Sequence, residues 1–172
     1  METLTLRAWT DDDLPMLRAA NSAAMTAHLN GPESAHRVDE RHARYLGLTD
    51  PSQARMLVID DGQRRALGAI GYWTVDWRGE PAFETGWFVL PEAQGRGVAS
   101  AALALLIGIA REHRGDRRHL VAFPGVDNAA SNGVCRRNGF ALVGSFEEQF
   151  RGAELAVNEW ALDLSAPARS RP

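Results

Sequence analysis

Cysteine is almost absent from this chain, because Cys135 is the single thiol among 172 residues. One thiol cannot form an internal disulfide or supply a Cys-x-x-Cys metal site, so a reducing compartment is expected. Long hydrophobic runs are lacking too, since the longest, residues 98–110, is too short to span a bilayer. Met1 is not followed by the basic and then apolar residues of a signal peptide. These absences predict a cytoplasmic protein with no membrane partner.

Positive charge is not in excess either: 19 Lys and Arg residues stand against 22 Asp and Glu residues, a net charge of −3. A nucleic-acid-binding domain usually has a basic surface, so no nucleic-acid partner is expected. The hydrophobic content of 45% is ordinary for a globular protein. The length suits one domain over residues 1–164. Residues 165–172 are polar and contain proline, which predicts a disordered tail.

The most informative stretch runs from residue 86 to residue 110. The apolar residues 86–90 predict a buried strand, and the Ala-, Leu- and Ile-rich residues 101–110 predict a buried helix. Gly95 and Gly97 lie between them, where glycine lets the backbone turn tightly and lets a ligand approach it. The first N–H groups of a helix have no partner within it and lie at the positive end of its dipole. This arrangement favours an anion, and a diphosphate in particular.

Two common phosphate-binding patterns do not fit this turn. The P-loop requires a lysine that the turn lacks. The dinucleotide pattern meets Ser100 at its third glycine position and lies mid-chain, without enough preceding strand–helix–strand units. Residues 94–99, Gln-Gly-Arg-Gly-Val-Ala, instead match the Gln/Arg-x-x-Gly-x-Gly/Ala pyrophosphate loop of the GCN5-related N-acetyltransferase (GNAT) superfamily. The chain therefore resembles that superfamily, whose members bind acetyl-CoA.

The predicted element order agrees with this resemblance. The order is β-α-α-β-β-β-α-β-α-β-β, with the first helix capped by Thr10 and continuing to about Met25. The resemblance implies a single-domain α/β (α+β) GNAT fold, with a mixed, mostly antiparallel seven-stranded sheet flanked by about four helices. The expected strands cover residues 3–9, 56–59, 66–77, 82–90, 120–123, 140–150 and 155–164, and the later helices residues 34–48, 101–110 and 129–137.

Two further segments resemble the RimJ/RimL-like branch of the superfamily. Residues 84–91, Glu-Thr-Gly-Trp-Phe-Val-Leu-Pro, are similar to its Glu-Ile-Gly-Tyr-x-Leu-x-Pro strand, and residues 128–140 to its Asn-x-x-Ser…Gly-Phe segment. The resemblance implies direct transfer of an acetyl group from acetyl-CoA to a primary amine, either a protein N-terminus or a small molecule. A non-catalytic acyl-CoA sensor or interaction module on the same fold is the alternative, and a dinucleotide-dependent oxidoreductase is a third. Relatives often dimerise, so a homodimer is considered as well.

The resemblance also implies a set of cofactor-binding residues. Backbone amides of the turn would hold the pyrophosphate, the strand before it would pair with the pantetheine arm beside a bulge at Gly86, and Asn128 would bond that arm. Arg96 is equally well explained as a solvated loop residue, and Asn128 as a helix cap. Arg136 and Arg137 could reach the 3′-phosphate or simply complement the helix dipole. The implied set is Trp87, Phe88, Val89, Gln94, Gly95, Arg96, Gly97, Val98, Ala99, Ser100, Asn128 and Ser131.

Acetyl transfer requires a neutral amine and a protonated leaving thiolate. A lysine-type amine has a pKa near 10.4, so only about one molecule in a few thousand is neutral at pH 7. Glu84, flanked by aromatic residues that would raise its pKa, is the candidate base, although a strand glutamate paired with an arginine is the alternative. Some branches protonate the thiolate with a tyrosine where this chain has Cys135, so Ser131 is the substitute acid suggested by the RimJ/RimL-like branch.

The histidines do not suggest a metal site. His36 and His42 are six residues apart and do not share a helix face, and no metal is predicted. By the resemblance, they and His28 belong to the region that lines the acceptor cleft.

Overall fold

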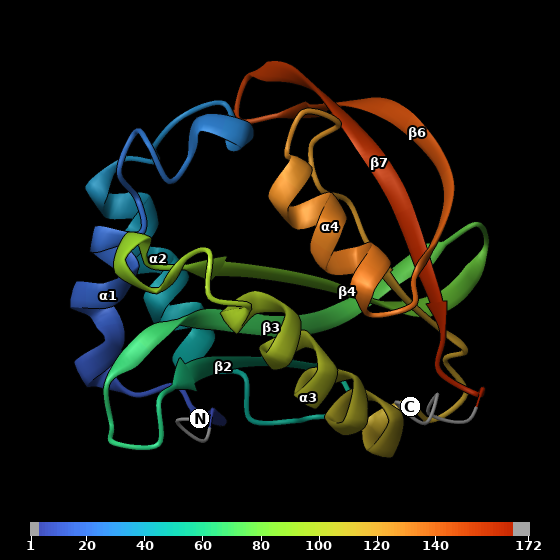
Figure 1. The fold of residues 1–172 in the computed structure, drawn as a ribbon, viewed down its shortest axis with the longest axis horizontal. Helices are drawn as coiled ribbons and strands as arrows, with labels where there is room; N and C mark the ends of the chain where they lie inside the picture. Colours follow the sequence, from blue (N-terminus) through green and yellow to red (C-terminus); the bar gives the residue numbers. More distant parts are fainter. Residues whose placement is uncertain (1–3, 167–172) are drawn as a thin grey trace.

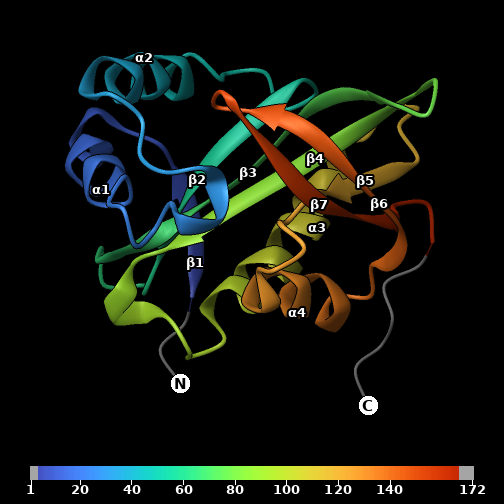
Figure 2. The same ribbon diagram turned by 90° about the horizontal axis from the view of Figure 1, so that it is seen from above.

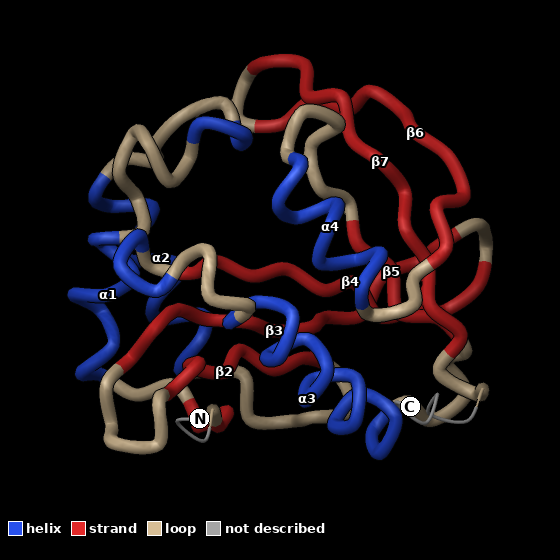
Figure 3. Tube along the Cα trace, in the orientation of Figure 1, coloured by secondary structure: helices blue, strands red, loops and turns tan. Residues whose placement is uncertain are grey.

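The computed structural model describes residues 4–166, within which seven strands form one sheet in the order β1-β2-β3-β4-β5-β7-β6. Figures 1 and 3 show the sheet from one side, and Figure 2 shows it with β1 and β5 labelled as well. Neighbouring strands are antiparallel except β4 and β5, which are parallel. This mixed, mostly antiparallel sheet with four α-helices confirms the predicted fold class. The strands are β1 (Thr5–Ala8), β2 (Ala54–Asp60), β3 (Ala66–Trp77), β4 (Glu80–Val89), β5 (His119–Ala122), β6 (Ala141–Phe150) and β7 (Ala153–Asp163), and the α-helices are α1 (Leu14–Ala19), α2 (Ala35–Leu46), α3 (Val98–His113) and α4 (Ala129–Arg137).

Helices cover both faces of the sheet: α1 and α2 lie on one side, and α3 and α4 on the other (Figure 2). Successive side chains of a strand point to opposite faces, so each central strand contributes side chains to two separate hydrophobic cores. On β2, Leu57 and Ile59 pack in the core beneath α3, whereas Val58 packs with α1 and α2. This explains why β2 and β3 are apolar on both faces and nearly continuous in hydrophobic sequence.

The first helix is shorter than predicted. In the part of the chain that the structure describes, α1 ends at Ala19 instead of continuing to about Met25, and three 3-10 turns accompany the α-helices: η1 (Asp11–Asp13), η2 (Ala27–Leu29) and η3 (Pro91–Ala93). Beyond it, the Asn21 side chain donates to the backbone O of Glu33 and accepts from its N–H, at 2.8 and 2.9 Å. Short polar side chains that bond the backbone in this way compete with helix formation. The segment that follows α1 instead reaches the β6–β7 turn, where the Asn30 side chain donates to the backbone O of Phe150.

The C-terminal end of the described chain is held by a local contact. Ser165 donates its N–H and hydroxyl to Asp163, which fixes the first residue of the expected tail, while residues 167–172 lie outside the described part. Thr3, the expected start of the first strand, lies outside it as well. Within residues 4–166, no helix combines the length and apolarity of a bilayer span.

Candidate functional site

Strands β4 and β5 separate shortly after they meet. They pair only at Phe83 with Leu120 and at Glu84 with Val121, so from Thr85 to Val89 strand β4 pairs with β3 alone. The backbone of β4 therefore presents an unpaired edge on its β5 side, which is the feature that an extended ligand can extend as an extra strand. A cavity of about 970 Å³ lies at this divergence, between β4, α3 and α4.

The expected bulge at Gly86 is absent. The β3–β4 register continues without a shift, from Gly68 opposite Val89 through Gly71 opposite Gly86. Instead, the opening arises on the other edge of β4, where β5 ends at Ala122 and the chain turns away through Pro124. Gly86 has a different role, because a Cβ there would lie 3.0 Å from the Trp73 ring, which crosses it.

The glycine turn opens onto the cavity. Gly95 and Gly97 have φ angles of +72° and +78°, in the left-handed region that favours glycine, and a Cβ on either would meet nothing within 4 Å. Gly97 is the N-cap of α3, so the next N–H groups are the partnerless first donors of a 16-residue helix. The Gln94 side chain donates to the backbone O of Val89 at 2.8 Å, which fixes the turn to the end of β4.

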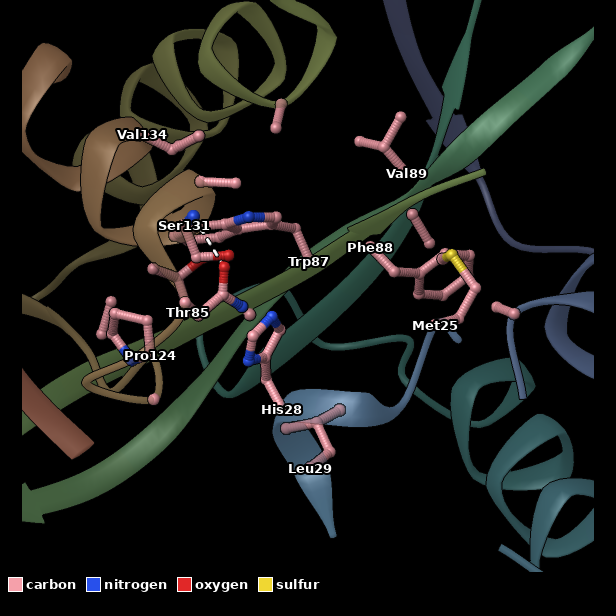
Figure 4. Close-up of a pocket in the computed structure, with 18 of the residues that line it drawn as sticks. Met25, His28, Leu29, Thr85, Trp87, Phe88, Val89, Pro124, Ser131 and Val134 are labelled. Carbon is pink, nitrogen blue, oxygen red and sulfur yellow. Dashed lines mark hydrogen bonds between the residues drawn. The ribbon is translucent and has the colours of Figure 1, made fainter. Parts of the chain in front are cut away.

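Helix α4 forms the facing wall. Asn128 is its N-cap and accepts from the Ser131 backbone N–H at 3.0 Å, so the capping interpretation of Asn128 is correct, and both residues line the cavity. Figure 4 shows Ser131 of α4, Trp87 of β4 and His28 of η2 around the same space. Asn132, one residue further, is buried and accepts from the Trp160 indole N–H at 2.8 Å, which holds α4 against β7.

Glu84 lies where β4 and β5 begin to separate, and it lines the cavity. The pKa of its carboxyl group is raised to about 7, chiefly by burial; a hydrogen bond from Trp73 opposes this shift, and the nearby charge of Glu148 adds to it. A carboxylate with a pKa near neutrality is suited to accept a proton at physiological pH. The alternative interpretation, a glutamate paired with an arginine, receives no support, since no such ion pair is found for it among residues 4–166.

Cys135 lies in the hydrophobic core with no exposed surface, and burial raises the pKa of its thiol to about 12. It is not among the residues that line the cavity, whereas Ser131, one turn earlier on α4, is. The position occupied by tyrosine in other branches is therefore a packing position here.

All but one of the predicted cofactor residues meet at this cavity. Arg96 is not among the lining residues, and of the two α4 arginines Arg137 lines the cavity while Arg136 stacks on the Trp160 ring at 5.6 Å. The Ser100 hydroxyl accepts from Asn138 at 3.0 Å, which links the start of α3 to the end of α4. The predicted residues that line it are Glu84, Trp87, Phe88, Val89, Gln94, Gly95, Gly97, Val98, Ala99, Ser100, Asn128 and Ser131.

The three histidines of the first half of the chain have different environments. His28 lines the cavity, with its Nδ1 3.1 Å from the Asp127 carboxylate. His42 is buried and accepts from the Trp9 indole N–H at 3.0 Å, and His36 is exposed beside Glu40. Among the described residues, no group of three or more His, Cys, Asp or Glu side chains is arranged to hold a metal ion.

The wall opposite the glycine turn is not predicted by any pattern in the sequence. The segment after α1 meets the β6–β7 turn there (Figure 1), where the Asn30 side chain donates to the backbone O of Phe150 at 2.7 Å, and the Arg151 guanidinium to that of Gly31 at 2.6 Å. These contacts join residues about 120 positions apart, which no local pattern indicates. The lining residues missed on this side are Arg41, Tyr45, Glu148, Phe150, Arg151 and Leu155.

The comparisons with known proteins agree with this geometry. The family model for the acetyltransferase (GNAT) domain matches residues 3–141. The chain belongs to the GNAT acetyltransferase family. Members of this family are acetyl-CoA-dependent N-acetyltransferases. No sequence among the curated proteins matches the chain significantly.

Solved structures of GNAT enzymes superpose on most of the chain. A RimL ribosomal L7/L12 α-N-protein acetyltransferase in complex with coenzyme A is 28% identical, with a TM-score of 0.77 and 95% of each chain covered. An acetyltransferase from Salmonella typhimurium that modifies the N-terminal serine of L7/L12 is 27% identical, with a TM-score of 0.77, covering 95% of this chain and 96% of that one. A spermidine N-acetyltransferase from Vibrio cholerae, with CoA and spermine, shares the fold at 20% identity and a TM-score of 0.76, covering 94% and 96% of the two chains.

Proposed function

We propose that this protein transfers the acetyl group of acetyl-CoA directly to a primary amine, and that the cavity between β4 and α4 is its active site. The observation that carries the proposal is the unpaired edge of β4 from Thr85 to Val89, which leads directly into the open glycine turn at the start of α3. A pantetheine arm has amides that can pair with such an edge, and a pyrophosphate suits a helix N-terminus.

The residues present fit this cofactor. The space beside Gly95 and Gly97 is open, so phosphate oxygens can approach the backbone N–H groups that begin α3. Trp87, Phe88 and Val89 would hold the arm along β4, with Asn128 on the opposite wall. When bound, acetyl-CoA supplies a thioester, an electrophilic carbonyl with a sulfur leaving group.

Two side chains of the protein would handle the two proton transfers of the reaction, one at the acceptor amine and one at the leaving sulfur. Glu84, with a pKa of about 7, would accept a proton from the acceptor ammonium, directly or through one water. Ser131 Oγ would hold the proton that neutralises the leaving sulfur. Removing the amine proton without a base costs about 4–5 kcal/mol at pH 7 for a lysine-type amine, but only about 1 kcal/mol for an α-amine.

The test is a screen for free CoA thiol with acetyl-CoA and a panel of peptide N-termini and small amines. We expect thiol release with at least one amine, and a rise in melting temperature with acetyl-CoA but not with NAD. Binding of acetyl-CoA without thiol release from any amine would instead indicate a non-catalytic acyl-CoA sensor. Stabilisation by NAD would indicate a dinucleotide site.

Replacing Ser131 with alanine tests the assigned acid. Because the Ser131 backbone N–H, not its hydroxyl, bonds Asn128, Ser131→Ala keeps the helix cap. We expect kcat to fall about 100-fold, the lower end of the usual contribution of a general acid, with acetyl-CoA affinity nearly unchanged, measured by steady-state kinetics and calorimetry. A wild-type kcat would exclude Ser131 as the acid. The control is Ser145→Ala, because Ser145 lies on β6 outside the cavity. The neighbouring Asn132 is not replaced, because it bonds Trp160 and holds α4 in place.

A further inference from the structure

Two arginines share one carboxylate at the wall of the cavity formed by α2 and the β6–β7 turn. Glu33 Oε2 lies 2.5 Å from Arg41 Nη2 and 3.2 Å from Arg151 Nη2. The three side chains are each about one-fifth exposed, and both arginines line the cavity while Glu33 does not. Two guanidinium groups therefore face the cavity with a single carboxylate behind them, which leaves one uncompensated positive charge.

Glu33 Oε2 pairs with both guanidinium groups by charge but bonds neither, and Arg151 donates instead to the backbone O of Gly31. Arg41 Nε has no acceptor either, although both it and Glu33 Oε2 are buried. Burial lowers the pKa of Arg151, and the charge of Arg41 lowers it further, against the attraction of Glu33. A second anion at this wall would supply an acceptor for Arg41 Nε and would offset the repulsion between the two arginines, because guanidinium–carboxylate pairs are among the stronger hydrogen-bonded contacts.

A negative region lies in the same cavity. Glu84 and Glu148 both line it, and they are close enough for the charge of Glu148 to raise the pKa of Glu84. The β6–β7 turn lies on the α2 side of the molecule, whereas the glycine turn lies on the opposite side (Figure 2), so the arginines are separate from the predicted pyrophosphate site. The cavity thus has two carboxylates and two guanidinium groups in its lining, and the guanidinium groups lie apart from the predicted pyrophosphate site.

We propose that the acceptor is an amine that also carries a carboxylate, of the amino-acid type. Its ammonium group would lie at Glu84 and Glu148, and its carboxylate at Arg41 and Arg151. This inference rests on the proposed function and names the substrate class for it. A polyamine would instead place a second positive charge against two guanidinium groups that already share one carboxylate, which is repulsive.

The test compares acceptors that differ only in the carboxylate. Thiol release at pH 8 is measured with free amino acids and with their amides, with short peptides beginning Asp or Glu and those beginning Asn or Gln, and with spermidine. We expect kcat/KM to be roughly 10- to 100-fold higher for the carboxylate-bearing member of the preferred pair. The preferred pair distinguishes a free amino acid from a peptide N-terminus with an acidic side chain. Equal or faster turnover of the amides, or of spermidine, would overturn the proposal.

Two variants are expected to act in opposite directions. Arg151→Met should raise KM for carboxylate-bearing acceptors roughly 10- to 100-fold and leave KM for their amides unchanged. Glu33→Gln should lower KM for the same acceptors, because it removes the carboxylate that competes for the arginines. A purely structural role would move both variants in the same direction and would affect amides equally, and that result would overturn the proposal.

Controls separate folding from recognition. Arg18→Met removes an arginine from the exposed Arg18–Asp39 ion pair outside the cavity, and should leave every acceptor unchanged. Should Arg151→Met fail to fold, Arg151→Lys keeps the charge but loses the planar two-donor geometry, and should still raise KM for carboxylate-bearing acceptors.

The failure of this inference can be told apart from failure of the proposed function. Thiol release with carboxylate-free amines alone would overturn the acceptor class and leave the acetyltransferase intact. Without any thiol release, calorimetry with free amino acids and the acetyl-CoA-loaded protein still decides the question. Millimolar or tighter binding that Arg151→Met weakens would support the carboxylate site, and no binding would overturn it.

Discussion

Glu84→Gln is expected to lower kcat by about 10²- to 10⁴-fold, the usual contribution of a general base, with little change in acetyl-CoA affinity. Glutamine keeps the shape of the side chain and can still accept from the Trp73 indole, so the cavity should be preserved. It cannot accept a proton. The measurement is steady-state kinetics with the preferred amine, alongside calorimetry with acetyl-CoA.

The pH profile distinguishes a base from a merely structural glutamate. Because burial raises the pKa of Glu84 to about 7, the wild-type rate should rise with pH through about 7 as the carboxylate forms. Glu148→Gln removes a nearby negative charge that raises this pKa, so the acidic limb should move to lower pH. Glu80→Gln, at the far end of β4, is the matched control and should change neither kcat nor the profile. An unaltered acidic limb in Glu84→Gln would exclude Glu84 as the base.

The same shift has a consequence for stability. The folded protein binds the Glu84 proton more tightly than an unfolded chain with the ordinary value of 4.5, so the free energy of unfolding falls as pH rises from about 4.5 to about 7. The Glu84→Gln variant has no such proton to lose, so its free energy of unfolding at pH 8 should exceed that of the wild type by at most about 3 kcal/mol. At pH 5 the two free energies of unfolding should differ less. Urea unfolding at the two pH values measures the difference. A site that functions at a cost in stability is typical of enzymes.

The parts of the site that lie close together in sequence were predictable. The strand over 82–90, the glycine turn and the helix that follows form one continuous segment, whose apolar runs and glycines act locally. The Asn128 cap is local for the same reason. These segments carry most of the predicted cofactor wall, and the structure brings them to one cavity.

The opposite wall could not be predicted, because it depends on tertiary contacts. The sequence indicates only that Arg41 belongs to a helix and Arg151 to a turn. The fold brings both side chains to Glu33. The opening beside β4 also had the wrong expected cause: a bulge is a local feature, whereas the observed opening depends on where β5 ends. The predicted end of α1 was wrong for a similar reason, because the Asn21 side chain is held by the backbone of Glu33, twelve residues away.

Gly97→Trp is expected to weaken acetyl-CoA binding about 100-fold or more. The indole would fill the open space beside the turn and block the first N–H groups of α3, and loss of even two contacts to a charged phosphate accounts for that factor. The substitution also strains the backbone, because φ at this residue is +78°. Calorimetry with acetyl-CoA measures the affinity, and the melting temperature reports the strain.

Gly79→Trp is the matched control for this strain. Gly79 lies in the β3–β4 turn with a φ of +82°, and a Cβ there would also meet nothing within 4 Å, yet it does not line the cavity. The two tryptophans should therefore lower the melting temperature similarly, while Gly79→Trp binds acetyl-CoA normally. Gly97→Ala completes the series, because it carries the same backbone strain with little added volume and should retain most of the affinity. If Gly97→Trp bound acetyl-CoA as tightly as Gly79→Trp, the glycine turn would not be the pyrophosphate site, since an indole cannot share that space with a phosphate.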